Sequence, residues 1–334
     1  MIILNRPFSL SPAGKDYLWG GKRLKTEYGK KLKMTPLAET WECSTHPDGL
    51  SIASDGIHEG MTLTDILKEH PEYVGTHPDV AGEGELPILV KLIDASKDLS
   101  IQVHPGDTYA RKYEHGSRGK TEMWYVLDAA PESELIYGLS HDSDPDTIRN
   151  AISDGTILDH LQHVPISKND VFYVAAGTVH AIGAGALIAE IQENSNITYR
   201  LYDYDRRDKD GNLRPLHIDK ALEVADLSRA GAPVQPMRVL RYEPGVAREL
   251  LTRCKYFEVH RMLVSADSDR AIPYRSDSLS FRVLLCVDGE GSLCYKADGE
   301  NIAVNITKGK CVFVPADSVK MRLSGKMQLL DICG

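Results

Sequence analysis

Two stretches decide the fold: NDVFYVAAGTVHAI at residues 169–182 and GKCVFVPADSVKMR at residues 309–322. Each has a turn residue, an apolar strand, a short turn containing alanine, Ser/Thr-Val and a further strand. The segments MWYVLDAAPESELIYG (123–138) and RVLLCVDGEGSLCYKA (282–297) resemble each other in the same way. Short β-branched or aromatic runs bounded by Gly, Pro and Asp are typical of all-β sandwiches and barrels. We therefore predict an all-β chain with two copies of one β-fold.

The spacing between the two similar segments is about twenty residues longer in the first copy than in the second. The excess coincides with a predicted helical insertion at residues 143–162, which Asp144 and Pro145 would begin as N-cap and first-turn residue. Further helices are predicted at TLTDILKEHPEYV, capped by Thr62 or Thr64, and near residue 220. The segment SRAGAPVQPM, rich in small residues and proline, marks the boundary between the copies. The predicted domains are residues 1–232 and 233–334.

Composition places the 334 residues among ordinary globular proteins, with 42% hydrophobic and 26% charged residues. The net charge of −9 argues against broad binding to nucleic acid or to an anionic membrane. The sequence has no long apolar run and no secretory signal pattern, so we expect a cytoplasmic protein. None of the six cysteines forms a C-x-x-C pair, and we interpret them as buried small apolar residues.

The two copies differ at the positions that carry chemistry. Glu122 and His180 in the first copy align with Arg282 and Lys320 in the second. A carboxylate and an imidazole can bind a metal ion, whereas two cationic side chains cannot. Any metal site is therefore predicted in the first copy only.

Gln102 and His104 lie two residues apart on a predicted strand, so both point to one face. His180 lies among Gly, Ala, Val and Ile, where a buried imidazole needs a specific partner. A structural histidine, and an ion pair between Glu122 and Lys120, are the ordinary alternatives. Taken together, two imidazoles, a carboxylate and an amide suit zinc, and iron, manganese or cobalt less selectively.

The segment EIQENSNITYRLYDYDR at residues 190–206 is dense in charged and amide groups but also contains apolar and aromatic residues. One interpretation is a solvated loop with weak salt bridges. The other is a partly buried segment whose arginines need carboxylate or phosphate partners. On that interpretation, Arg200 and Arg206 would bind an anionic sugar.

Several long motifs resemble those of type I mannose-6-phosphate isomerases, in the right order from about residue 5 to residue 220. They are WGGKRL, ETWECSTHPDGLS, KLIDASKDLSIQVHPGD, GKTEMWYVLD, AAGTVHAIGAG and EIQENSNITYRLYDYDR. The usual P-A-G-T turn of that family is Ala-Ala-Gly-Thr at residues 175–178 here. The last hundred residues diverge most.

The resemblance implies tandem cupin-type jelly rolls, with one zinc ion per chain in the first. The zinc ligands it implies are Gln102, His104, Glu122 and His180. It implies a catalytic role for Arg200, phosphate contacts from Ser100 and Arg206, and a site carboxylate at Glu190.

The implied reaction is the interconversion of mannose 6-phosphate and fructose 6-phosphate through a cis-enediol(ate). Zinc and Arg200 would stabilise the negative charge that develops on oxygen. Glu190 is the first candidate for the base that moves the proton, followed by Lys120 and Lys91, and Lys91 is also assigned to substrate binding. Two alternatives stay open: an iron-dependent cupin oxygenase, and a non-catalytic cupin that binds sugar phosphates.

Overall fold

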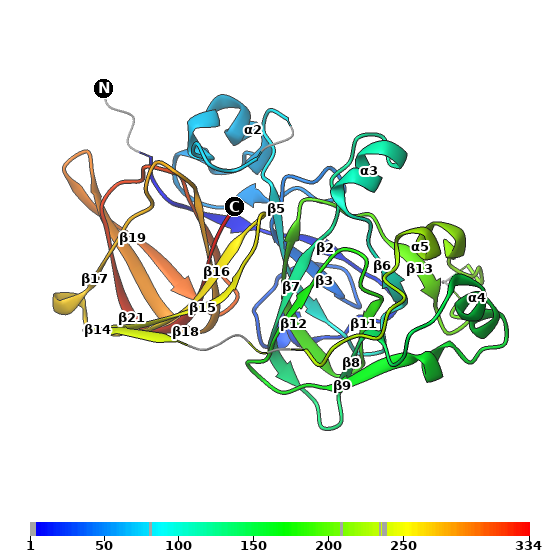
Figure 1. The fold of residues 1–334 in the computed structure, drawn as a ribbon. Helices are drawn as coiled ribbons and strands as arrows, with labels where there is room; N and C mark the ends of the chain where they lie inside the picture. The colour runs from blue at the N-terminus through cyan, green and yellow to red at the C-terminus, as the bar shows by residue number, and fades with distance from the viewer. Residues whose placement is uncertain (1–4, 80–81, 208–209, 234, 236–238) are drawn as a thin grey trace.

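The computed structural model describes residues 5–79, 82–207, 210–233, 235 and 239–334. Strands dominate, they pair antiparallel, and Figure 1 shows them gathered into two lobes side by side. The predicted all-β class is confirmed. In the described part of the chain, no helix has the length and apolar character that a membrane span requires.

The first lobe contains two sheets. One has the strand order β10-β7-β12-β5-β3-β2, and the other has the order β13-β6-β11-β8-β9. The strands of the first sheet are β2 (Ala13–Lys15), β3 (Glu39–Cys43), β5 (Ile88–Asp94), β7 (Glu122–Ala129), β10 (Val171–Val174) and β12 (Ala186–Glu193). Those of the second are β6 (Ile101–Val103), β8 (Glu134–Leu139), β9 (Leu161–Pro165), β11 (His180–Ile182) and β13 (Tyr199–Tyr202).

The second lobe contains a ten-stranded sheet with the main order β14-β15-β16-β21-β18-β20-β1-β4, in which β17 pairs with β21 and β19 with β18. The strands are β1 (Phe8–Ser11), β4 (Ile52–Ala53), β14 (Leu240–Glu243), β15 (Val246–Arg253), β16 (Glu258–Ala266), β17 (Ile272–Tyr274), β18 (Arg282–Ala297), β19 (Glu300–Thr307), β20 (Cys311–Val314) and β21 (Met321–Cys333).

The strand register supports the internal repeat. In the first lobe Val174 of β10 pairs with Glu122 of β7, and in the second lobe Val314 of β20 pairs with Arg282 of β18. The aligned positions of the sequence therefore occupy equivalent places in the two sheets. One apolar core cluster contains residues from both lobes, including Val90, Tyr125, Val283 and Phe313, and so holds them together.

The helices lie outside the sheets. The α-helices are α1 (Arg23–Thr26), α2 (Leu63–Glu69), α3 (Asp107–Tyr113), α4 (Pro145–Ser153) and α5 (Ile218–Val224), and the 3-10 helices are η1 (Gly56–His58), η2 (Pro71–Tyr73), η3 (Ile157–His160) and η4 (Ser268–Arg270).

The predicted insertion at 143–162 is two short helices rather than one. The Asp144 carboxylate caps α4 by accepting hydrogen bonds from the amides of Asp146 and Thr147, as expected. Gly155 has a φ of +73°, a conformation that ends a helix, so η3 follows as a separate turn. Thr62, one of the two proposed caps, caps α2.

The N-terminal strand lies with the C-terminal half of the chain. Strand β1 pairs with β20 on one side and β4 on the other, so Phe8 faces Phe313 across the sheet. The expected boundary segment includes residues 234, 236 and 237, which lie outside the described residues. The division into 1–232 and 233–334 stays a prediction, with residues 8–11 and 52–53 contributing to the sheet of the second lobe.

Phe8→Ala tests how firmly β1 is integrated. Phe8 is almost fully buried and its ring lies 5.3 Å from that of Phe313. Removing the ring leaves a cavity, so we expect the free energy of unfolding to fall by about 3–5 kcal/mol in a denaturant titration. Ser11→Ala, at an exposed position of the same strand, is the control. If Phe8→Ala lowered the free energy of unfolding no more than the control does, β1 would contribute little to the stability of the second lobe.

Candidate metal centre and substrate pocket

Three side chains form a compact buried group at the centre of the first lobe. His104 directly follows β6, Glu122 begins β7 and His180 begins β11. The Nε2 atoms of His104 and His180 lie 3.6 and 3.3 Å from the Glu122 carboxylate oxygens. One possible ligand atom from each residue lies within 4.8 Å of the others. The structure thus brings together three of the four expected ligands.

Local pairing explains this convergence. His180 pairs with Gln102 across β11 and β6, which places the Q-x-H pair beside the second histidine. The turn before β11 is tied to the same strand end, because the Gly177 amide donates to the His104 carbonyl at 2.9 Å. Gly177 has a φ of +92°, which a residue with a side chain rarely adopts.

The group has the protonation pattern of a metal site. The Nδ1 atom of His180 lies 2.8 Å from the Thr178 carbonyl, which fixes the proton on Nδ1 and leaves Nε2 facing Glu122. Burial lowers the pKa of His180 to about 4, and burial together with the Lys120 charge lowers that of His104 well below its usual value. Both imidazoles are therefore neutral, as ligands must be.

The buried carboxyl group of Glu122 is the third part of this candidate metal site. It is fully buried, and burial raises the pKa of Glu122 to about 7 although the Lys120 ammonium lies 2.7 Å away. A metal ion bound between the two imidazoles would add positive charge to that of Lys120 and favour the ionised carboxylate. Two neutral imidazoles and one carboxylate suit a divalent transition metal.

Lys120 and Gln102 lie beside this group and also line the adjoining pocket. The Lys120 ammonium lies 2.7 Å from Glu122 and 3.0 Å from Nε2 of His104. The Gln102 amide nitrogen lies 3.4 Å from Nε2 of His180. Gln102 is thus placed where its amide oxygen, after rotation, would face the same point.

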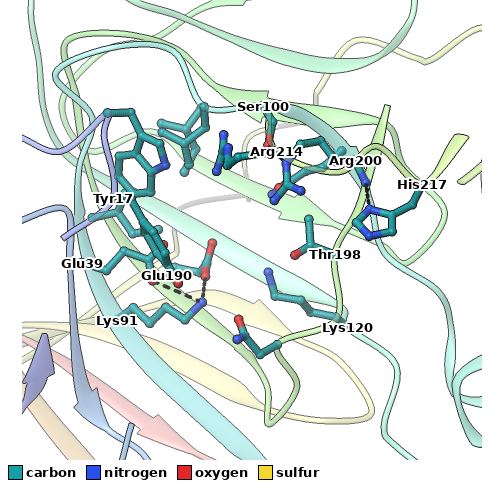
Figure 2. Close-up of a pocket in the computed structure, with 16 residues that line it drawn as sticks. Tyr17, Glu39, Lys91, Ser100, Lys120, Glu190, Thr198, Arg200, Arg214 and His217 are labelled. Atoms are coloured by element: carbon teal, nitrogen blue, oxygen red, sulfur yellow. Dashed lines mark hydrogen bonds and ion pairs between the residues drawn. The ribbon is translucent and has the colours of Figure 1, made fainter. Parts of the chain in front are cut away.

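The adjoining pocket has a volume of about 250 Å³, and Figure 2 shows its side chains converging from several strands. Its lining is mainly polar and cationic. The residues are Tyr17, Trp19, Glu39, Lys91, Ile93, Leu99, Ser100, Gln102, Lys120, Ile182, Glu190, Asn196, Thr198, Arg200, Arg214 and His217.

Arg200 is held rigidly at one side of this pocket. Its Nε donates to the Ser100 hydroxyl at 3.2 Å, and its Nη1 donates to the Pro215 carbonyl at 2.9 Å. The Arg200 amide also donates to Nδ1 of His217 at 3.2 Å, which fixes the backbone. Two predicted site residues, Ser100 and Arg200, therefore lie in contact.

Arg206 lies elsewhere. Its guanidinium donates to Asp203 and to the Asp98 carbonyl, and it does not line the pocket. Arg214 occupies the pocket instead, bound to the same Asp203 carboxylate at 2.7 and 2.5 Å. The role of Arg206 as a phosphate contact stays a prediction, and Arg214 was not among the site residues predicted from the sequence.

Glu190 and Lys91 form a buried pair on the opposite side. Lys91 Nζ lies 3.0 Å from the Glu190 carboxylate, to which the Trp124 indole also donates at 3.0 Å. Burial opposes ionisation of Glu190, but Lys91 and Lys120 outweigh it and hold its pKa well below the usual range. The Glu190 carboxylate is therefore ionised and bordered by cations.

Known proteins resemble this chain over most of its length. Residues 8–145 match the family model described as phosphomannose isomerase type I, catalytic domain. The mannose-6-phosphate isomerase of Bacillus subtilis is 34% identical over 97% of both chains. That of Streptococcus mutans is 36% identical over 78% of this chain and 79% of its own. The chain belongs to the type I phosphomannose isomerase family.

A solved structure of the family extends this likeness over both lobes. The crystal structure of the Bacillus subtilis mannose 6-phosphate isomerase superposes with a TM-score of 0.88 at 32% identity, covering 98% of this chain and 99% of that one. The architecture is therefore the tandem cupin type that the sequence predicted. The family model includes Gln102, His104 and Glu122, and the polar segment with Arg200 lies beyond it.

His180→Ala tests the metal group. Because His180 offers one of two neutral imidazoles, its loss should remove most bound metal, measured by mass spectrometry of the purified protein. His163→Ala is the control, since His163 pairs with Glu134 and contacts the Leu158 carbonyl at exposed positions outside the metal group. Full metal occupancy in the His180 variant would exclude this residue as a ligand.

Proposed function

We propose that this chain interconverts mannose 6-phosphate and fructose 6-phosphate in the pocket beside the His104–Glu122–His180 group. The observation that carries the proposal is the union of this buried group with a cationic pocket in a chain of the type I family. Family membership favours the isomerase over the oxygenase and the non-catalytic alternatives.

Zinc is the metal we propose, held by His104, Glu122 and His180, with Gln102 as a fourth ligand. Bound there, zinc would supply Lewis acidity to the sugar oxygens. The two neutral imidazoles and the buried Glu122 carboxyl group beside them support this donor set.

The phosphate end of the substrate would bind at Ser100 and the neighbouring arginines. Ser100 and Arg200 are in contact, and Arg214 lines the same pocket. Arg206 would act on this site through Asp203, because it shares that carboxylate with Arg214. Binding of a remote phosphate supplies energy that orients the reacting carbons.

The chemical step moves a proton between C2 and C1 of the open-chain sugar. Glu190 is ionised and lines the pocket, so it can accept the C2 proton and return it to C1. Arg200 would stabilise the negative charge on the enediolate oxygen, since its guanidinium is fixed before substrate enters. Lys91 keeps Glu190 ionised and oriented, and Lys120 is the second candidate for the proton transfer.

Arg200→Ala should lower kcat/KM for mannose 6-phosphate by about 10²–10³-fold while metal content stays unchanged. A coupled assay of fructose 6-phosphate formation measures kcat/KM, and mass spectrometry of the purified protein measures its metal content. Arg149→Ala, which removes an exposed charge that pairs with Asp219, is the control. Normal turnover in the Arg200 variant would remove this residue from the reaction.

Glu190→Gln should slow exchange of the C2 proton with solvent deuterium by about 10²–10⁴-fold, because the amide cannot accept the proton. Glu193→Gln is the matched control on the same strand. Its carboxylate accepts from the Thr121 amide, a bond that the glutamine oxygen can keep. Unchanged exchange in the Glu190 variant would transfer the role of base to Lys120.

A further inference from the structure

The second lobe has a cationic cavity of its own. It measures about 510 Å³ and shares no lining residue with the pocket of the first lobe. Its charged and titratable lining comes from six strands and the residue after β17: Arg241, Arg248, Arg253, His260, Tyr274, Arg275, Arg282 and Asp331. Five guanidinium groups thus surround a single lining carboxylate.

The cavity lies at the place in the second sheet that the metal centre and Glu190 occupy in the first. Arg282 corresponds to Glu122, because each begins its strand opposite an equivalent valine. Two strand positions further on, Trp124 pairs with Glu190 and Leu284 pairs with Asp331. Across the next strand Glu190 pairs with Lys91, whereas Asp331 pairs with His260. The repeated fold therefore presents an equivalent hollow with a different set of charges.

Asp331 does not use the hydrogen-bonding capacity of its arginine neighbours. The buried carboxylate accepts a hydrogen bond from the Tyr274 hydroxyl at 3.0 Å. Arg282 and Arg248 lie 3.8 and 4.0 Å from its oxygens, which is too far for hydrogen bonds. Their guanidinium groups gain charge compensation from Asp331, and among the described residues their donors bond only to the Met262 sulfur, which lies 3.7 Å from Arg248 Nη1.

Arg241 adds uncompensated charge. It pairs directly with Arg248 across β14 and β15, and like charges at such positions repel each other. Arg241 forms no ion pair with another described residue. Arg253 and Arg275, in contrast, are bound to Glu258 and Asp317, and Glu258 also pairs with His260. The charge left over comes from Arg241, Arg248 and Arg282 around Asp331.

We propose that this cavity binds a small phosphate-bearing anion, held by Arg241, Arg248 and Arg282. Guanidinium groups suit phosphate because their paired donors match two oxygens at once. A dianion would relieve the repulsion between Arg241 and Arg248. The inference does not depend on the proposed function, because it concerns residues of the second lobe alone.

Equilibrium dialysis of the metal-loaded full chain against radiolabelled inorganic phosphate tests the proposal. The wild type should bind one equivalent of phosphate per chain. This phosphate should stay bound when a mannose 6-phosphate analogue saturates the pocket of the first lobe. The double substitution Arg248→Gln and Arg282→Gln should weaken this equivalent by tenfold or more. It should leave kcat/KM for mannose 6-phosphate and the circular dichroism spectrum unchanged.

The double substitution Arg149→Gln and Arg270→Gln is the control, because it removes the same net charge from exposed positions outside this cavity. It should leave phosphate binding unchanged. Equal phosphate binding by the wild type and the Arg248/Arg282 variant would overturn the proposal, as would equal weakening in the control. Absence of isomerase activity would contradict only the proposed function, since the dialysis does not measure turnover.

Discussion

The buried carboxylate of Glu122, between the imidazoles of His104 and His180, is the constraint on which the first lobe depends. Removing a carboxylate from water is costly unless a cation compensates its charge. Lys120 supplies one positive charge at 2.7 Å, and the two Nε2 atoms are directed at the same point. The strand pairings that place His180 beside Gln102, and Glu122 opposite Val174, therefore define both the fold and its chemistry.

The repeated sheet carries two different charge sets. In the first lobe, Glu122 and Glu190 are balanced by Lys91, Lys120 and the site proposed for a metal ion. In the second lobe, arginines surround Asp331 instead. The divergence follows from single positions, since Arg282 replaces the carboxylate at the start of the equivalent strand. The same strand pairing thus carries a carboxylate beside two imidazoles in one lobe and arginines around a carboxylate in the other.

Much of this arrangement was predictable because strand patterns and local motifs are short-range features. The aligned segments at 169–182 and 309–322 predicted the repeat, and the spacing of Gln102 and His104 predicted a shared face. Pairing between distant segments was not predictable, so the position of β1 beside β20 was missed. Helix α3 was missed because its seven residues carry no side-chain cap.

Arg214 was missed for a related reason. Its role depends on Asp203, eleven residues earlier in sequence, and on how the intervening loop returns to the pocket. The sequence feature that could have indicated Arg214 is the short segment RPLH at residues 214–217, because Arg214 and His217 both line the pocket. Sequence order alone does not distinguish it from Arg206, which binds the same carboxylate from outside the pocket.

The most direct measurement is turnover of mannose 6-phosphate to fructose 6-phosphate by the purified chain, before chelation, after chelation and after zinc is restored. If the His104–Glu122–His180 group holds the metal that the reaction requires, chelation abolishes turnover and zinc restores it. Full turnover by protein shown to be metal-free would contradict this account of the site.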